Sequence, residues 1–381
     1  MRTGASRGWS AVLAVQFVTT AAPMAVLPFL FIHLQSLTAS GTQDVAFWTA
    51  VAAAAPACAA VVATPLWGRL AARRSLAGLL ALSCLLSAAS YGLQAWARTP
   101  ELFASARLLQ GAAGSGIIPL LAVERMRRTV GRGYVNLQQA FAAGCLAGPL
   151  LGGLASDYAA LPILLGSAAA LCIPLSLACA ILLQGTVSRN AAITAEQVTS
   201  RPSKKDAVVI LAASIGTAGA FGFAPFFAAW AIERIGSGIS TATIGAIHAA
   251  GWLAAIAILP VWGRAIERLP SAASLQLSLM GMAVTLGLLA LPGSVLGIVV
   301  LRILQGGTQA GLAPSLYALV GRSEQPEQSI AAARTALTLG QILGPAICGL
   351  ALPWGGMNAA LLAAALLPLI GLILLSTGYR S

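Results

Sequence analysis

Long apolar segments alternate with short polar ones along the whole chain. Each apolar segment has the length of about 20 residues that a helix needs to cross the hydrocarbon core of a bilayer. None shows the two-residue alternation of a barrel strand, and in lipid a helix satisfies its own backbone groups. We place twelve such segments, at residues 9–33, 45–67, 76–97, 102–123, 134–156, 161–184, 207–232, 241–262, 271–292, 294–319, 331–352 and 356–378.

Composition excludes a water-soluble fold. Of the 381 residues, 58% are hydrophobic and 8% are charged, whereas a soluble domain carries about 25% charged residues. The sequence therefore predicts an all-α polytopic membrane protein with twelve transmembrane helices.

The chain has a net charge of +12. Its basic residues are distributed as the positive-inside rule predicts for a membrane protein, which argues against a nucleic-acid partner. Most basic residues are expected in alternate loops, and only Arg98 and Arg234 are expected in the opposite loops, with Arg107 and Arg302 inside spans. We therefore predict a multi-pass protein of the cytoplasmic (inner) membrane with both termini cytoplasmic. The basic residues of the predicted cytoplasmic side are Arg2, Arg7, Arg69, Arg73, Arg74, Arg125, Arg127, Arg128, Arg132, Arg189, Arg201, Lys204, Lys205, Arg264, Arg268, Arg322, Arg334 and Arg380.

The longest polar stretch, residues 185–206, has no helical apolar period and reads as a cytoplasmic linker. It separates a predicted N-terminal six-helix half, residues 1–184, from a C-terminal six-helix half, residues 207–381. We expect no metal or organic cofactor.

Matching residues recur between these halves at a nearly constant offset, which is the mark of an internal duplication. Duplicated halves around a midplane binding site are a transporter architecture. The matches are Trp67-Gly68-Arg69 with Trp262-Gly263-Arg264 and Arg107-Leu108-Leu109-Gln110-Gly111 with Arg302-Ile303-Leu304-Gln305-Gly306 (offset 195), Gly144, Gly148 and Pro149 with Gly340, Gly344 and Pro345 (196), and Pro28-Phe29 with Pro225-Phe226 (197).

A stripe of small residues marks the fifth span. Gly144, Gly148 and Gly152 recur every four residues, with Pro149 and Gly153 beside them. Small residues at that spacing let two helix backbones approach closely in lipid, and proline bends a helix. The stripe indicates either plain helix packing or a conformational seam that flexes between open states.

Two arginines are expected one to two turns inside their spans, where a charge must be paired or hydrated. Arg107 and Arg302 are candidates for proton coupling or substrate binding, or alternatively for a structural salt link or carbonyl clamp. Gln110 and Gln305 follow one turn later on the same helix face. His248, inside the eighth span, is a candidate proton carrier or a hydrogen-bonded packing residue.

Other polar and aromatic residues leave the picture open. The residues Phe221, Phe223, Phe226, Phe227 and Trp230 form either an apolar cavity wall or ordinary packing. The six cysteines have neither C-x-x-C nor metal spacing, so we expect no metal site. No acidic residue is expected at mid-membrane, so the sequence displays no carboxylate relay.

Several motifs resemble one family. The segment Gly144–Gly153 resembles the G-x-x-x-G-P-x-x-G-G motif in the fifth helix of major facilitator superfamily exporters, and Arg107–Gly111 resembles that family's fourth-helix R-x-x-x-G motif. The resemblance covers nearly the whole chain and is closest to twelve-helix drug/proton antiporters, a group that includes multidrug and siderophore exporters. It implies that Arg107 takes part in proton coupling.

The segment Gly68–Arg74 resembles the family's gate-loop motif G-x-L-a-D-r-x-G-r, with Ala72 in place of the aspartate and Ser75 in place of the second glycine. In the family that aspartate helps to lock the cytoplasmic gate. Glu267, at the position equivalent to Ala72, is the candidate to take over part of this role. The predicted gate-loop residues are Gly68, Arg69, Arg73, Gly263, Arg264 and Glu267.

These features predict a monomeric secondary transporter in the lipid bilayer that exports a small organic molecule by alternating access and antiport with protons. A proton-coupled uptake symporter is the alternative. A membrane-embedded enzyme would need clustered nucleophiles or metal ligands, and a receptor or scaffold would leave the repeat unexplained. Because the embedded groups are cationic or neutral, an anionic, zwitterionic or neutral substrate is expected in preference to a cation.

Overall fold

The structure is a computed structural model that describes residues 2–38, 41–114, 119, 122, 130–183, 203–269, 272–291, 294–324 and 326–379. Within these ranges every regular element is helical. The elements are α1 (Arg2–Val26), η1 (Leu27–Phe29), α2 (Leu30–Leu37), α3 (Thr42–Arg73), α4 (Leu76–Trp96), α5 (Pro100–Ala112), α7 (Val130–Asp157), α8 (Leu161–Leu182), α9 (Lys204–Gly222), η3 (Ala224–Phe226), α10 (Phe227–Ile235), α11 (Thr241–Arg268), α12 (Ala273–Leu289), α13 (Val295–Gln309), α14 (Leu312–Val320), α15 (Pro326–Ala351), η4 (Leu352–Trp354) and α16 (Gly356–Gly378).

Ten helical stretches among the described residues are long and apolar enough to cross a membrane, and α12 is apolar but shorter. The segment expected at 102–123 is described as a continuous helix only over Pro100–Ala112. The predicted all-α polytopic membrane fold is confirmed. Most of the predicted linker lies outside the described residues, and its last residues, from Lys204, already belong to α9.

Three predicted spans are interrupted helices. The first and seventh each contain a short 3-10 turn, η1 around Pro28 and η3 around Pro225, because proline has no N–H with which to continue a helix. The tenth breaks at Gly311, where an added Cβ would overlap the ring of Trp262. Pro28-Phe29 and Pro225-Phe226, which match at an offset of 197, therefore have the same 3-10 structure in both halves.

The prediction that the gate residues lie in loops is wrong. Gly68, Arg69 and Arg73 belong to the end of α3, and Gly263, Arg264 and Glu267 to the end of α11. The helical hydrogen bonds continue past the apolar stretch, and the chain turns over only Arg74 and Ser75 before α4. The Ser75 side chain caps α4 by accepting a hydrogen bond from the Gly78 amide.

Other basic residues predicted in loops are also helical. Arg2 and Arg7 lie in α1, Arg132 lies in α7, and Arg268 is the last residue of α11. These helices extend beyond the apolar segments predicted at 9–33, 134–156 and 241–262. Polar helical turns therefore replace part of the expected loops.

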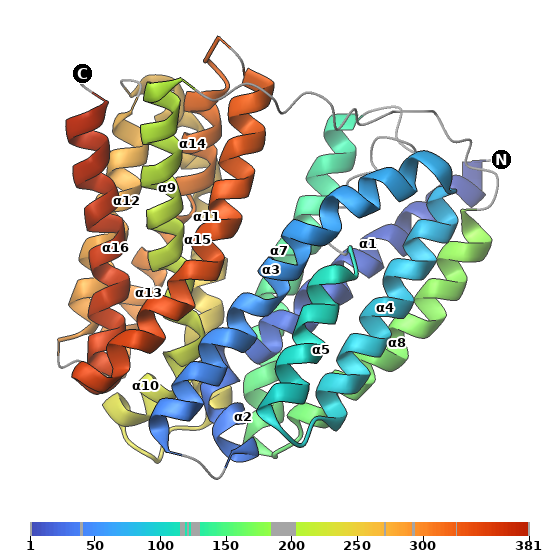
Figure 1. Cartoon of the computed structure of the whole chain (residues 1–381), viewed down its shortest axis with the longest axis horizontal. Helices are drawn as coiled ribbons and strands as arrows, with labels where there is room; N and C mark the ends of the chain where they lie inside the picture. The colour runs from blue at the N-terminus through green and yellow to red at the C-terminus, as the bar shows by residue number, and fades with distance from the viewer. Residues whose placement is uncertain are drawn as a thin grey trace. The chain divides into compact units, whose positions relative to one another are not determined.

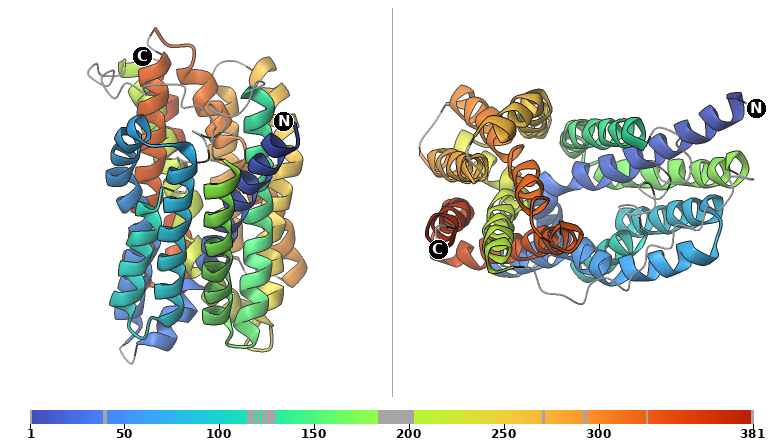
Figure 2. Two further views of the ribbon diagram at one scale, coloured as in Figure 1. Left: turned by 90° about the vertical axis from the view of Figure 1, so that its right-hand side faces the viewer. Right: turned by 90° about the horizontal axis from the view of Figure 1, so that it is seen from above.

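Contacts divide the chain into two compact units, which are described separately. The first unit comprises Met1–Leu27 and Ala55–Ala195, and the second Pro28–Ala54 and Glu196–Ser381. In the first unit α4 packs on α8 and α5, and α1 on α7 and α8; in the second, α9 packs on α15 and α16, and α13 on α11 and α12 (Figures 1 and 2). The predicted domain boundary at 184 stays a prediction.

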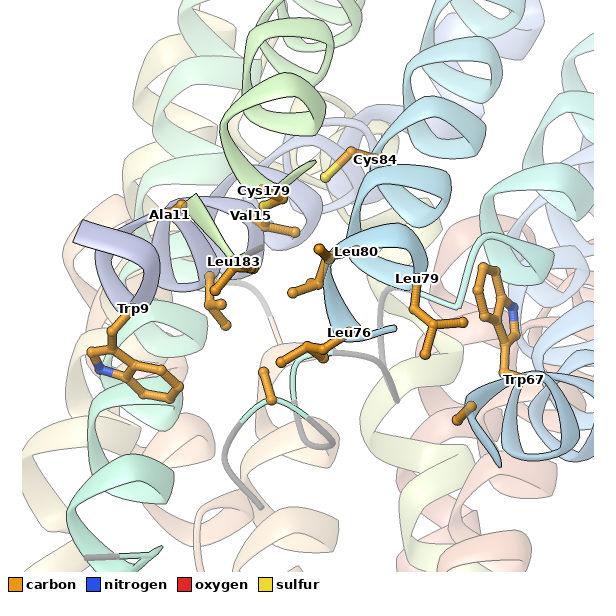
Figure 3. Packing of buried hydrophobic residues seen from close by; sticks show 14 of the residues in the cluster. Trp9, Ala11, Val15, Trp67, Leu76, Leu79, Leu80, Cys84, Cys179 and Leu183 are labelled. Atoms are coloured by element: carbon orange, nitrogen blue, oxygen red, sulfur yellow. The ribbon is translucent and has the colours of Figure 1, made fainter. Parts of the chain in front are cut away.

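One apolar cluster of the first unit lies where α1, α4 and α8 meet. Val15, Leu80 and Leu183 converge there, and the side chains of Cys84 and Cys179 point toward each other (Figure 3). Leu79 lies beside the indole of Trp67 at the end of α3. This packing buries the apolar face of α4 that lies nearest its N-terminus.

Repeated side-chain contacts show the duplication in three dimensions. The indole N–H of Trp67 donates to the Ala112 carbonyl at 2.8 Å, and that of Trp262 donates to the Gly307 carbonyl at 2.7 Å. Thr99 caps α5 and Ser294 caps α13 in the same way. The three pairs of positions, Trp67 and Trp262, Ala112 and Gly307, and Thr99 and Ser294, are each 195 residues apart. The two halves therefore share these local contacts.

Candidate functional site

The first candidate site is the Arg107 cluster, which consists of Arg107, Gln110, Gln94 and Ser90. Arg107 and Gln110 lie one turn apart on α5, and the guanidinium Nη1 donates to Gln110 Oε1 at 3.2 Å. Gln94 Nε2 on α4 donates to the same oxygen at 3.2 Å and to Ser90 Oγ at 3.0 Å. Arg107 is only 3% exposed. This cation is therefore held inside a polar network of two helices of the first unit.

The second is the Arg302 cluster, which consists of Arg302, Gln305, His248 and Phe227 in the second unit. Arg302 on α13 donates to Gln305 Oε1, and its Nη2 lies 3.2 Å from His248 Nδ1 on α11. The guanidinium carbon stands 4.7 Å from the centre of the Phe227 ring, a cation–π contact. His248 is 4% exposed and packs edge-on against Phe227.

Close backbone contacts position both arginines. A Cβ on Gly111 would overlap the Pro56 carbonyl of α3, and a Cβ on Gly306 would overlap the Gly251 carbonyl of α11. Both pairs occupy equivalent positions in the repeat. Because glycine allows the helices to touch, Arg302 reaches His248 directly across the α11–α13 contact.

The two faces of α10 lie in different environments, one buried and aromatic and the other beside a cavity. Phe227 and Trp230 are buried on one face of α10, with ring centres 5.8 Å apart. Ala229, Ile232 and Glu233, on the opposite face, help to line a cavity of about 460 Å³ formed by residues of the second unit. Phe227 thus belongs to the Arg302 cluster, whereas the cavity with its exposed carboxylate belongs to another surface.

Several buried polar atoms have no hydrogen-bond partner in the described structure. In the first unit they include hydroxyl or amide oxygens of Ser83, Ser87 and Gln94. In the second unit they include the N–H donors Arg302 Nε and Trp230 Nε1. Buried polar groups normally find partners, so these atoms mark places where a ligand or water is needed.

Acidic side chains stay out of the interior throughout the described part of the chain. Asp206 is half-buried and accepts a hydrogen bond from Ser329 Oγ at 3.0 Å. The other acids whose side chains the structure describes are exposed: Asp44, Glu101, Asp157, Glu233, Glu267 and Glu324. Within the ranges described, the charged side chains that are buried or half-buried inside spans are therefore mainly arginines.

The glycine stripe of α7 packs against α1 within the first unit. A Cβ on Gly148 would lie 2.6 Å from both the Ala21 carbonyl oxygen and the Met24 side chain. Gly144 faces Thr20, and Gly152 touches the Ala25 carbonyl. Gly340 and Gly344 of α15 make matching contacts with α9. Gly153, Pro149 and Pro345 are buried beside these contacts, and the role of the stripe as a conformational seam stays a prediction.

The structure brings His248, which the sequence singled out separately, to the pair Arg302 and Gln305. The expected pairing of Arg107 with Gln110 on one helix face is a hydrogen bond. Sequence reasoning missed Gln94 and Ser90, although two polar residues four positions apart in an apolar span were a visible signal. It also did not predict the contact between Phe227 and Arg302, because only the fold shows which helix packs against the aromatic face of α10.

Comparison with known proteins agrees with this architecture. The family model described as Major Facilitator Superfamily matches residues 207–380. The chain is 25% identical over 350 residues to the Staphyloferrin B transporter of Staphylococcus aureus, covering 86% of this chain and 82% of that protein. It is 32% identical over 160 residues to the Multidrug resistance protein MdtG of Yersinia enterocolitica, but this match covers only 38% of the length of MdtG.

Solved structures show the same fold. A bacterial homolog of the human lysosomal transporter Spinster, in an inward-facing and occupied conformation, gives a TM-score of 0.80 at 10% identity, covering 98% of this chain and 96% of that chain. The nucleoside transporter NupG gives 0.77 at 15% identity, covering 98% and 99%. The helical spans, the duplicated scaffold and these relatives make the chain similar to membrane transporters of the major facilitator superfamily, whose family model matches its second half.

Proposed function

We propose that this protein is a proton-coupled exporter of a small organic molecule that carries a negative charge. Transport proceeds by alternating access, in which the two halves expose a common site to each side of the membrane in turn. The protein acts as a monomer in the cytoplasmic membrane. Its coupling is antiport, with protons entering as substrate leaves.

The observation that supports this substrate class is the sign of the embedded charge. Arg107 and Arg302 are cationic, the hydrogen-bonding partners of Arg302, Gln305 and His248, carry no negative charge, and the described acids lie outside the interior. A lipophilic cation would meet repulsion as well as desolvation there. A carboxylate, hydroxamate or catecholate instead accepts forked hydrogen bonds from arginine.

The names of two relatives support the choice of substrate. The chain is similar to the Staphyloferrin B transporter and to MdtG, which are named for siderophore transport and multidrug resistance. The motif at Gly144–Gly153 resembles that of exporters. We therefore assign efflux of a siderophore-like or drug-like compound, and uptake by symport is the outcome that would contradict it.

Inside-out vesicles with an acidic interior test coupling, direction and substrate together. We expect the pH gradient to drive accumulation of a carboxylate-bearing chelator and a protonophore to abolish it, with vesicles lacking the protein as the control. Accumulation of a cationic dye alone would reject the substrate class. Substrate movement in the same direction as protons would reject antiport.

Membrane orientation follows from the same proposal. A cysteine at Ser188, introduced after replacing the six native cysteines, should react with an impermeant thiol reagent in inside-out vesicles and not in intact cells. A cysteine at Gly41, between α2 and α3, should behave in the opposite way. Labelling of position 188 in intact cells would overturn the assignment of a cytoplasmic linker.

A further inference from the structure

We propose that the anionic group of the substrate binds within the second unit, on Arg302 and the indole N–H of Trp230, and that Arg107 is not part of this anion site. The inference rests on the proposed function and sharpens it, because it replaces a symmetric pair of arginines with one binding arginine. It concerns contacts inside each unit only.

The Arg302 guanidinium has a donor that no acceptor in the described structure satisfies. Arginine has five N–H donors and no acceptor. Arg302 uses Nη1 on Gln305 and Nη2 on His248, while Nε is buried and has no acceptor. Since Arg302 only donates, His248 Nδ1 is the acceptor, so His248 is neutral in this arrangement. Neither polar partner neutralises the cation.

The indole of Trp230 supplies a second donor without an acceptor. Its side chain is 1% exposed, and its Nε1–H has no acceptor, although a buried indole N–H usually has one. Phe227 contacts both groups: its ring centre is 5.8 Å from that of Trp230 and 4.7 Å from the Arg302 guanidinium carbon. The two side chains that carry these unsatisfied donors therefore pack against the same aromatic ring.

Donors without acceptors define the ligand. A group that satisfies an arginine N–H and an indole N–H must offer oxygen acceptors, and a carboxylate or a phenolate also supplies the missing negative charge. Phe223, Phe227 and Trp230 form the apolar surroundings. Arg302 itself is only half-buried. These features fit a small aromatic or otherwise planar anion.

Arg107 differs although it occupies the equivalent position. Its network is shared among Gln110, Gln94 and Ser90 across two helices. The unpartnered atom of that network is an acceptor, Gln94 Oε1, which would oppose an anion. Gln305 and His248 act as positioning residues, since they orient the Arg302 guanidinium.

The test measures binding of salicylate and of its neutral isostere salicylamide to the purified full-length protein by calorimetry. Gln305→Glu places an internal carboxylate on Arg302 with little change of shape. We expect it to weaken salicylate binding at least about tenfold while salicylamide binding changes little. Gln110→Glu, the same substitution at the equivalent position of the first unit, is the matched control and should leave the salicylate Kd within about threefold.

Two further variants separate the donors. Trp230→Phe removes one N–H and should weaken salicylate binding about threefold to tenfold, and Arg302→Lys, which loses the guanidinium fork, should weaken it more. Thermal unfolding of each variant checks that the fold survives. Equal losses in Gln110→Glu and Gln305→Glu would establish a symmetric clamp and overturn the inference, as would equal affinity for salicylate and salicylamide or no salicylate binding at all. None of these results would alter the vesicle measurement of export.

Discussion

In the first unit Arg107 shares the oxygen of Gln110 with Gln94, whereas in the second unit Arg302 shares its guanidinium between Gln305 and His248 and lies over Phe227. The position equivalent to Gln94 is Leu289, and the position equivalent to His248 is Ala53. Duplication has therefore preserved where the arginines stand and changed what surrounds them. The comparison teaches that equivalent positions in a repeat need not share a role.

Backbone contacts have diverged less than side chains. Gly148 meets the Ala21 carbonyl, and Gly344 meets the Ala218 carbonyl. Farther along, Gly152 of α7 touches Ala25, whereas in the second unit the small residue is Gly222 of α9, which faces Cys348 of α15. Each half retains a close helix contact, but the glycine has moved from one helix to the other.

The largest expected effect on export comes from placing a large side chain at the glycine contact that both halves retain, at Gly148 or Gly344. Gly148→Leu should abolish export because the side chain would meet the Ala21 backbone, where overpacking costs about 1–3 kcal/mol or more. Gly344→Leu should act similarly. Both are measured as efflux per amount of membrane-inserted protein.

Gly166→Leu on α8, where a Cβ would meet nothing within 4 Å, is the matched control and should transport normally. Normal export by Gly148→Leu would show that the contact opens without cost and would break the equivalence of the two halves at this point.

Replacing each arginine is the next test. Arg107→Ala should abolish gradient-driven transport, since the first unit carries the arginine that resembles the family's coupling residue. Arg302→Ala should mainly raise KM for an anionic substrate, by about tenfold or more, because it removes charge-assisted hydrogen bonds. Initial rates in vesicles, with and without a pH gradient, distinguish the two effects; identical profiles would remove the asymmetry.

A smaller change is expected when the first unit is made to resemble the second at Gln94. Gln94→Leu removes hydrogen bonds to Ser90 and Gln110 but also removes an unpartnered acceptor. The net change in the free energy of unfolding should stay within about 1 kcal/mol, while transport falls because Gln110 loses one of its two donors. Thermal unfolding and efflux assays measure these separately, and unchanged efflux would make the Gln94 network purely structural.

The smallest effect is expected at the ends of α3 and α11. Glu267 is exposed, so Glu267→Ala should change the free energy of unfolding by less than about 0.5 kcal/mol. If Glu267 takes part in a cytoplasmic lock, as its position equivalent to Ala72 in the repeat suggests, the variant should lower the export rate about twofold. A rate equal to that of the parent protein would restrict Glu267 to the surface charge pattern.

The sequence by itself determined the membrane class, the duplication and ten of the twelve predicted spans. Apolar segments of bilayer length admit one backbone solution, the helix, because lipid offers no partner for N–H and C=O groups. The constant offset linking Arg107 with Arg302 and Trp67 with Trp262 followed from sequence alone. It did not determine where helices end, since α3 and α11 continue through polar turns that a hydropathy pattern assigns to loops.

Only the tertiary structure decided which embedded residues meet. Arg302 and His248 are 54 positions apart, and their contact depends on Gly251 and Gly306 letting α11 and α13 touch. Phe227 joins them because the chain bends at Pro225 before α10 begins. Such pairings arise from packing between helices, which the periodicity of a single helix does not specify.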